Sequence, residues 1–219
     1  MKGWPRRVVA LALAGGIGAF LASCGGDSNG SGPTYPTVKF VGNESCPTAS
    51  ASPYSPSPPK VNGNSIVGQA MDEMPHNHVA PPAKIQYNHD PPTSGCHYSL
   101  GQPDPAPIQA GAYNQEIPAE YWVHNLEHGY IAVLYNCPTG CATEFQTLVT
   151  WRKGLPNDPA ANGQIPYAKV IVIPWHTMAK HFAVVSWDYY LGLDTLDMKQ
   201  IQAFYDNHVG NSPEGALTP

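Results

Sequence analysis

The sequence Gly-Tyr-Ile-Ala-Val-Leu-Tyr at residues 129–135 decides the fold, because it has the composition of a buried strand. Two later runs of β-branched and aromatic residues, at residues 169–173 and 182–187, predict further strands. Shorter strands are expected at residues 84–87 and 121–124. Strands therefore dominate the middle of the chain.

Two helices are expected after the first buried strand. Residues 141–155 form one, since Leu148 and Val149 would share a face. The other begins with Asp194 as its N-cap and includes Ile201 on its apolar face. Because no repeat is visible, we predict an α+β fold: a single domain with a mostly antiparallel sheet and two helices in the C-terminal half.

The N-terminal half is expected to be rich in loops. Gly, Pro and Ser make up 19 of the 36 residues at positions 25–60, without any apolar periodicity. Such a composition predicts an extended tether rather than a packed unit. We therefore divide the chain into a signal segment at residues 1–23, a tether at residues 24–60 and one globular domain at residues 61–219.

The first 24 residues predict an exported protein. Three basic residues precede residues 8–22, an uncharged and mostly apolar segment that is too short to span a bilayer comfortably. The sequence Leu-Ala-Ser-Cys at residues 21–24 then resembles the bacterial lipobox, in which the cysteine becomes the lipidated first residue. On this interpretation Cys24 anchors the protein outside the cytoplasm, on the bacterial cell envelope. An ordinary cleaved signal or a marginal membrane anchor are the alternatives.

The charge of the chain limits its partners. The signal segment contains three of the 11 basic residues and none of the 16 acidic ones, so the remainder has a formal net charge of −8. An acidic chain without basic clusters argues against nucleic acid and against electrostatic docking on anionic lipid. The expected partner is the membrane, through the N-terminal lipid, and a second copy or another envelope protein stays open.

Four cysteines remain beside Cys24, and an even number outside the cytoplasm favours two disulfides. Of the three pairings, we expect a local loop between Cys137 and Cys141 and a longer clamp between Cys46 and Cys96. The rival interpretation is that Cys137 and Cys141 form a redox pair or a site for copper transfer. Their place between a strand and a helix resembles that of the cysteines in thioredoxin-like copper-delivery proteins.

Nine histidines give the chain its main chemical feature. The candidate metal ligands are His78, His97, His124 and His128. Imidazole is a common ligand of transition metals, and thioether sulfur adds a preference for softer ions. We hypothesise that these rings converge on copper, or alternatively zinc, with Met74 or Met178 as a soft ligand and Glu127 orienting a ring. The competing interpretation is that each ring only satisfies loop carbonyl groups.

The sequence His-Asn-Leu-Glu-His at residues 124–128 also matches the H-x-x-E-H pattern of inverted zinc peptidases. That chemistry needs both histidines on one helix. Gly129 and the β-branched run behind it argue against a helix here, so we do not expect a peptidase. Whether the protein is an enzyme stays open, with a non-catalytic role favoured.

Several segments together resemble a known family. The sequences Pro-Pro-Thr-Ser-Gly at residues 91–95, His-Tyr at 97–98 and Val-His-Asn-Leu-Glu-His-Gly-Tyr at 123–130 are similar to the bacterial domain-of-unknown-function family numbered 3105. His78 and a late Pro-Glu at residues 213–214 match further positions of its pattern. The resemblance implies a secreted or membrane-anchored protein and places the four histidines in motif positions, but it names no reaction.

Two features depart from that family pattern. Cys96 stands where the family usually has proline, and most members lack the pair Cys137 and Cys141. Both departures favour extra disulfides in this chain. The sequence thus predicts a membrane-anchored envelope lipoprotein with a non-catalytic, copper-preferring domain. A thiol or copper-transfer redox protein and a purely structural or assembly module are the alternatives.

Overall fold

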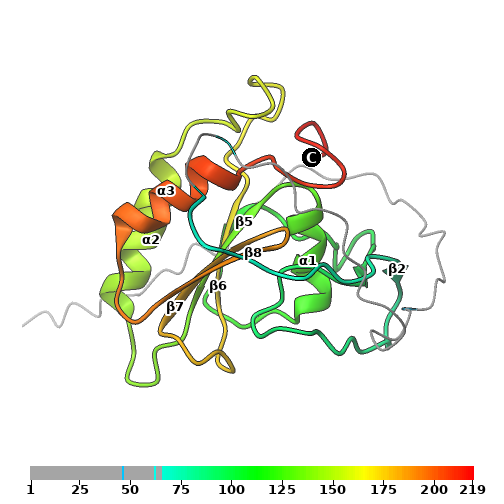
Figure 1. Ribbon diagram of the computed structural model, residues 1–219, viewed down its shortest axis with the longest axis horizontal. Coiled ribbons are helices and arrows are strands. Elements are labelled where there is room, and N and C mark those ends of the chain that lie inside the picture. The colour runs from blue at the N-terminus through cyan, green and yellow to red at the C-terminus, as the bar shows by residue number, and fades with distance from the viewer. Residues whose placement is uncertain (1–45, 47–61, 63–65) are drawn as a thin grey trace, which may run out of the picture.

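The computed structural model describes Cys46, Asn62 and residues 66–219. Figure 1 shows the arrangement of the elements. The predicted signal segment, Cys24 and the tether apart from Cys46 lie outside the described residues. Among the helices that the structure describes, none has both the length and the apolar character needed to cross a membrane.

A six-stranded sheet forms the centre of the domain, in the order β1-β8-β7-β5-β6-β4. Its strands are β1 (Gln69–Ala70), β4 (Gly111–Ala112), β5 (Ile131–Tyr135), β6 (Val170–Pro174), β7 (Phe182–Ser186) and β8 (Tyr189–Leu193). β6 pairs in parallel with β4 and β5, whereas the pairings β5–β7, β7–β8 and β8–β1 are antiparallel. The predicted α+β class with a mostly antiparallel sheet is confirmed.

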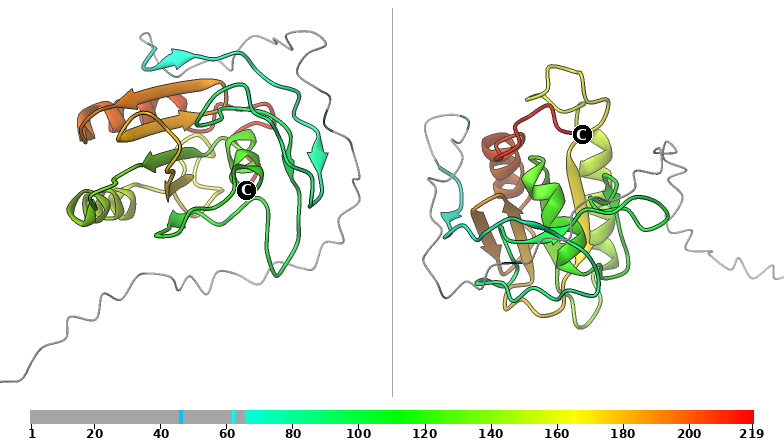
Figure 2. Two further views of the ribbon diagram at one scale, coloured as in Figure 1. Left: turned by 90° about the horizontal axis from the view of Figure 1, so that it is seen from below. Right: turned by 90° about the vertical axis from the view of Figure 1, so that its right-hand side faces the viewer.

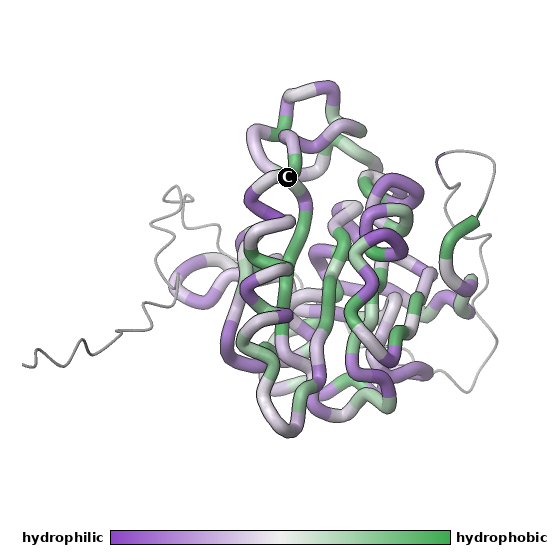
Figure 3. The backbone as a smooth tube through the Cα atoms, turned by 90° about the vertical axis from the view of Figure 1, so that its left-hand side faces the viewer, coloured by the Kyte–Doolittle hydropathy of each residue, from purple (hydrophilic) through white to green (hydrophobic). Residues whose placement is uncertain are grey.

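Helices cover both faces of this sheet. α1 (Ala119–Glu127) lies on one face, and α2 (Ala142–Gly154) and α3 (Met198–His208) lie on the other (Figures 1 and 2). Along β5, Ala132 and Leu134 join the core beneath α1, while Ile131 and Val133 join the core beneath α2 and α3. Because successive strand residues point to opposite faces, a strand buried on both sides must be apolar throughout. Figure 3 shows this concentration of hydrophobic residues on the central strands.

Most of the predicted elements are present. The three long strand predictions correspond to β5, β6 and β7, and the two predicted helices correspond to α2 and α3. The start of α3 differs from the prediction, because Asp197 rather than Asp194 caps it by accepting hydrogen bonds from the N–H groups of Lys199 and Gln200. No strand forms at residues 84–87, and β8 was not predicted.

The prediction of a strand at residues 121–124 is wrong, since these residues belong to helix α1. Trp122, Val123 and Leu126 are fully buried against the sheet, so packing of one helical face stabilises this short helix. Gly129, with φ +82°, ends the helix and turns the chain into β5. The glycine that argued against a helix is therefore the residue that terminates it.

Both predicted disulfides are confirmed. Cys46 is bonded to Cys96, and Cys137 is bonded to Cys141. The first bond closes a loop with a sequence separation of 50 residues, which contributes about 4 kcal/mol in the chain-entropy account. It also attaches Cys46 to the residue that precedes β3 (His97–Tyr98), a strand of the second, two-stranded sheet.

Gly129→Ala should destabilise the protein more than Gly140→Ala. Both glycines have positive φ. A Cβ atom added to Gly129 would lie 2.8 Å from the Cα of Gly210, whereas a Cβ atom added to Gly140 would have no atom within 4 Å. We expect a loss of about 1 kcal/mol for Gly140→Ala from backbone strain alone, and about 3 kcal/mol for Gly129→Ala. Urea unfolding measures both, and equal losses would contradict the close approach of the two glycine backbones.

Candidate metal centre

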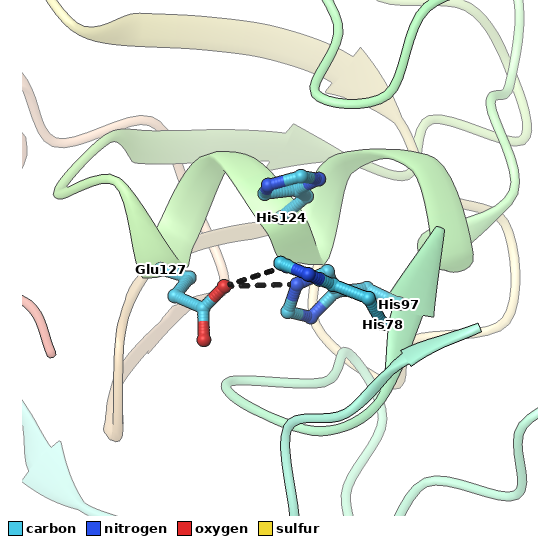
Figure 4. Close-up of side chains that lie close together, drawn as sticks. All are labelled: His78, His97, His124 and Glu127. Atoms are coloured by element: carbon cyan, nitrogen blue, oxygen red, sulfur yellow. Dashed lines mark ion pairs between the residues drawn. The ribbon is translucent and has the colours of Figure 1, made fainter. Parts of the chain in front are cut away.

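A pair of short strands and one helix bring four ligand-type side chains together. His78 lies on β2 (His78–Val79) and His97 on β3, where the parallel register places the two residues opposite each other. His124 and Glu127 are three residues apart on α1 and therefore share a helical face. Figure 4 shows these side chains facing one another. One ligand atom from each of the four lies within 4.8 Å of the others.

Backbone carbonyl groups fix the orientation of two of these rings. The Nδ1 atom of His97 is 2.8 Å from the carbonyl oxygen of Gly95, and that of His124 is 2.7 Å from the oxygen of Tyr98. A carbonyl oxygen can only accept, so each Nδ1 must carry the proton and donate it. In a neutral ring the other nitrogen, Nε2, then presents a lone pair, which is the form in which imidazole binds a metal.

The carboxylate of Glu127 faces these ring nitrogens. Its Oε2 atom is 3.0 Å from Nε2 of His97 and 3.4 Å from Nε2 of His78. The contact with His97 is short but lacks hydrogen-bond geometry, and neither Nε2 of His97 nor Oε2 of Glu127 has another hydrogen-bond partner among the described residues. A buried carboxylate against a lone pair is repulsive unless a proton or a metal ion lies between them.

Burial and neighbouring rings determine the protonation of the centre. Burial, together with the nearby His97 and His128, places the pKa of His124 well below its usual value, so this ring is neutral. Burial alone would raise the pKa of Glu127, but hydrogen bonding to the carboxylate, first of all from His76 at Oε1, outweighs that effect and holds the pKa well below its usual range. Glu127 is thus an anion with an exposed side-chain fraction of only 3%.

His76 positions Glu127 from the solvent side. Its Nδ1 atom is 2.5 Å from Oε1 of Glu127, the oxygen that does not face His97, and its Nε2 atom is 4.0 Å from Glu73. The hydrogen bond to Glu127 raises the pKa of His76. His76 was not among the predicted ligands, although it belongs to a methionine- and histidine-containing segment with Met71, Met74 and His78 that suggested a copper-like ligand set.

The remaining sequence-predicted ligands lie outside this group of four. The ring of His128 packs against that of His124 with centroids 4.5 Å apart, but its Nδ1 is 2.6 Å from the backbone oxygen of Pro219 and its Nε2 is 3.1 Å from Glu214. The sulfur of Met74 accepts a hydrogen bond from the N–H of Asn88. Met178 packs into the core beneath α1.

Glu127 therefore stands in the position that the four-histidine hypothesis gave to His128. That hypothesis treated the glutamate as a residue that only orients a ring, whereas the structure places its carboxylate among the potential ligands. The reason is helix α1, which directs His124 and Glu127 to the same side while its C-cap, His128, contacts the C-terminal residues.

The helix also changes the argument about the H-x-x-E-H pattern. The expectation that residues 124–128 are not helical is wrong, since α1 runs through Glu127. The peptidase arrangement is nevertheless not formed, because it requires both histidines on the metal and a free glutamate as base. Here both ring nitrogens of His128 have other partners, and Glu127 faces the histidines.

The chain was compared with known proteins. A family model described as "Protein of unknown function (DUF3105)" matches residues 78–218. The chain belongs to this family. The matched region begins at His78 and contains all four residues of the centre, so the resemblance inferred from the sequence is confirmed. No curated protein and no solved structure matches the chain.

Asp188 is another buried carboxylate whose charge acts on His76. Asp188 occupies the turn between β7 and β8 with φ +60°, and it is fully buried. Burial, followed by the charge of Glu73, raises the pKa of Asp188 to about 8. Because the folded-state pKa exceeds the unfolded one, the folded chain keeps a proton that the unfolded chain has released, so stability falls as the pH rises from about 4 to about 8.

Asp188→Asn should remove this dependence. Asparagine has the same shape, tolerates left-handed backbone and carries no titrating proton. We expect the variant to exceed the parent protein in stability at pH 8 by about 5 kcal/mol and to equal it near pH 4. Denaturant unfolding across this range measures the effect, with the exposed Asp104→Asn as control. An unchanged pH slope in Asp188→Asn would contradict the assignment.

Proposed function

We propose that the protein binds one divalent transition-metal ion through His78, His97, His124 and Glu127. The observation that carries this proposal is the short contact between Nε2 of His97 and Oε2 of Glu127, two buried atoms without hydrogen bonds to other described residues. A cation between them would convert the repulsion of a lone pair and an anion into two metal–ligand bonds. The hydrogen bonds from Nδ1 of His97 and His124 to carbonyl groups are the partners that ligating histidines require.

The ligand set favours a cupric ion, with zinc as the alternative. Three imidazoles and one carboxylate suit Cu(II) and Zn(II), and the order of affinities for nitrogen and oxygen ligands places Cu(II) highest. The argument for Cu(I) weakens, because the sulfur of Met74 already accepts a hydrogen bond and Met178 is a core residue. Copper preference therefore rests on the imidazoles rather than on a thioether.

A binding role fits the centre better than catalysis. Four protein ligands fill every position of a four-coordinate ion, whereas catalytic sites keep one position open for water or substrate. The side chains of His97 and Glu127 are 0% and 3% exposed, while that of His78 is 35% exposed. An ion would therefore reach the centre from the side on which His78 is exposed. We infer that the protein holds an ion and exchanges it at this exposed side.

Membrane attachment belongs to the same proposal. Lipidated Cys24 would anchor the chain outside the cytoplasm, and the following tether would carry the domain. The disulfide between Cys46 and Cys96 supports this arrangement, because it joins a residue of the proposed tether to the residue that precedes His97. The bond between Cys137 and Cys141 lies elsewhere, with Cys137 packed against the core beneath α2 and α3. Among the described residues, the group of four contains no cysteine, so a thiol does not enter this centre.

Removing single ligands tests the metal proposal. His97→Ala, His124→Ala and Glu127→Gln should each lower the affinity for Cu(II) and Zn(II) by at least about 100-fold, since loss of an outer partner alone costs 10–100-fold. His128→Ala should cost about tenfold or less, because this ring only packs beside His124. Competition titrations with a chelator measure the affinities, and His181→Ala, which alters an exposed ring, is the control. Unchanged binding in Glu127→Gln would overturn the assignment.

Cys24→Ala tests the anchor. The variant should not be lipidated and should partition into the aqueous phase of a detergent phase separation, whereas the parent protein expressed in a bacterium partitions with detergent. Ser28→Ala, which changes a residue beyond the lipobox-like sequence, should behave like the parent. A parent protein recovered with a free N-terminus in the aqueous phase would contradict lipid attachment.

A further inference from the structure

A cavity of about 230 Å³ lies beside the candidate metal centre. Residues 100–109 border it on one side, and the end of α1 and the entry into β5 border it on the other. Its apolar and aromatic wall consists of Leu100, Pro105, Pro107, Ile108, Tyr130 and Tyr167. Flat rings pack well against such a wall, because tyrosine and proline offer broad, rigid surfaces.

The size and charge of the cavity restrict its ligand. Pockets for drug-sized molecules begin at roughly 300 Å³, so this cavity suits a single ring. None of its lining residues is Asp, Glu, Lys or Arg. A charged ligand would lose its hydration here without gaining a counter-charge from the wall, so the ligand must be neutral.

The polar side chains of the wall, which include Gln102, Gln109 and the two tyrosines, select a further feature of the ligand. The hydroxyl of Tyr130 donates to that of Tyr167 over 3.3 Å. A hydroxyl that accepts one hydrogen bond still has its own proton to donate, and the ring of Tyr167 lines the cavity and is only partly buried, so this proton is available to a ligand there. A ligand with a carbonyl or similar acceptor would satisfy it.

We propose that this cavity binds a small, uncharged molecule that carries one ring and one hydrogen-bond acceptor. This site goes beyond metal binding and does not depend on it. His128 lines the cavity, and its ring stands between the cavity and His124. The ring molecule therefore sits next to the metal centre and supplies none of its ligands.

Benzamide is a suitable probe, since it is neutral and has one ring and one carbonyl group. With a chelator present, its titration into the purified full-length protein should shift the amide NMR signals of the lining residues with a Kd of about 1 mM. Benzoate, an anion of the same shape, should bind at least about tenfold more weakly because its charge is not compensated. No saturable shift at the lining residues, or equal affinity for benzoate, would overturn the proposal.

Two variants locate the site. Leu100→Trp fills the cavity from its partly exposed rim and should abolish benzamide binding. Tyr167→Phe removes only the donor and should weaken binding about fivefold, the worth of one neutral hydrogen bond. Retained dispersion of the NMR spectrum shows that a variant is folded. If Leu100→Trp does not fold, Tyr167→Phe alone decides, and unchanged benzamide affinity in either folded variant would contradict the site.

Discussion

The buried carboxylate of Glu127 is the constraint on which the centre depends. The side chain of Glu127 is an anion with only 3% exposure, and such a buried charge needs a positive charge beside it. It faces imidazoles whose Nδ1 protons are donated to carbonyl groups, which leaves a lone pair on each Nε2. His76 supplies part of that charge from the solvent side through its hydrogen bond to Oε1. At Oε2 the nearest groups are Nε2 of His97 and Nε2 of His78, at 3.0 and 3.4 Å, and each supplies positive charge only when it carries a proton. The group of four could hold a metal ion, and the ion that we propose would lie between Oε2 of Glu127 and the ring nitrogens.

The rest of the fold holds that arrangement in place. The sheet buries one face of α1 and so fixes His124 and Glu127, which lie on the helix. The parallel pairing of β2 with β3 fixes His78 against His97, and the disulfide at Cys96 fixes the start of β3. Behind the helix, the buried amine of Lys169 donates to the backbone oxygens of His128 and Ala216 and pairs with Asp158. This contact ties the C-terminal residues to the end of α1.

The sequence predicted the central strands because burial on both faces of a sheet leaves an unmistakable apolar run, as at residues 129–135. It did not predict α1, because nine residues that include Tyr, Trp and Val favour a helix only once tertiary packing buries one side. The strand β8 was also missed, because the two-residue turn at Trp187 and Asp188 lacks the Asn-Gly or Asp-Gly pair that marks such hairpins.

The wrong prediction of a strand at residues 121–124 also explains why Glu127 was not predicted as a ligand. The abundance of histidine and the family resemblance indicated His78, His97 and His124 as candidates, but the side to which each ring points depends on the elements that carry them. With residues 121–124 taken as a strand, Glu127 had no reason to share a face with His124; on a helix, three residues apart, it does. The role of His76 depends on the path of the chain before β2, which no sequence pattern specifies.

The most direct test of the proposed metal site is a crystal structure of the protein with Cu(II) or Zn(II), in which anomalous scattering locates the ion. The account predicts one ion at roughly 2.0–2.2 Å from Nε2 of His97, Nε2 of His124 and a carboxylate oxygen of Glu127, with His78 as the fourth ligand. A direct hydrogen bond between His97 and Glu127 that persists under saturating metal, with no ion between them, would contradict it.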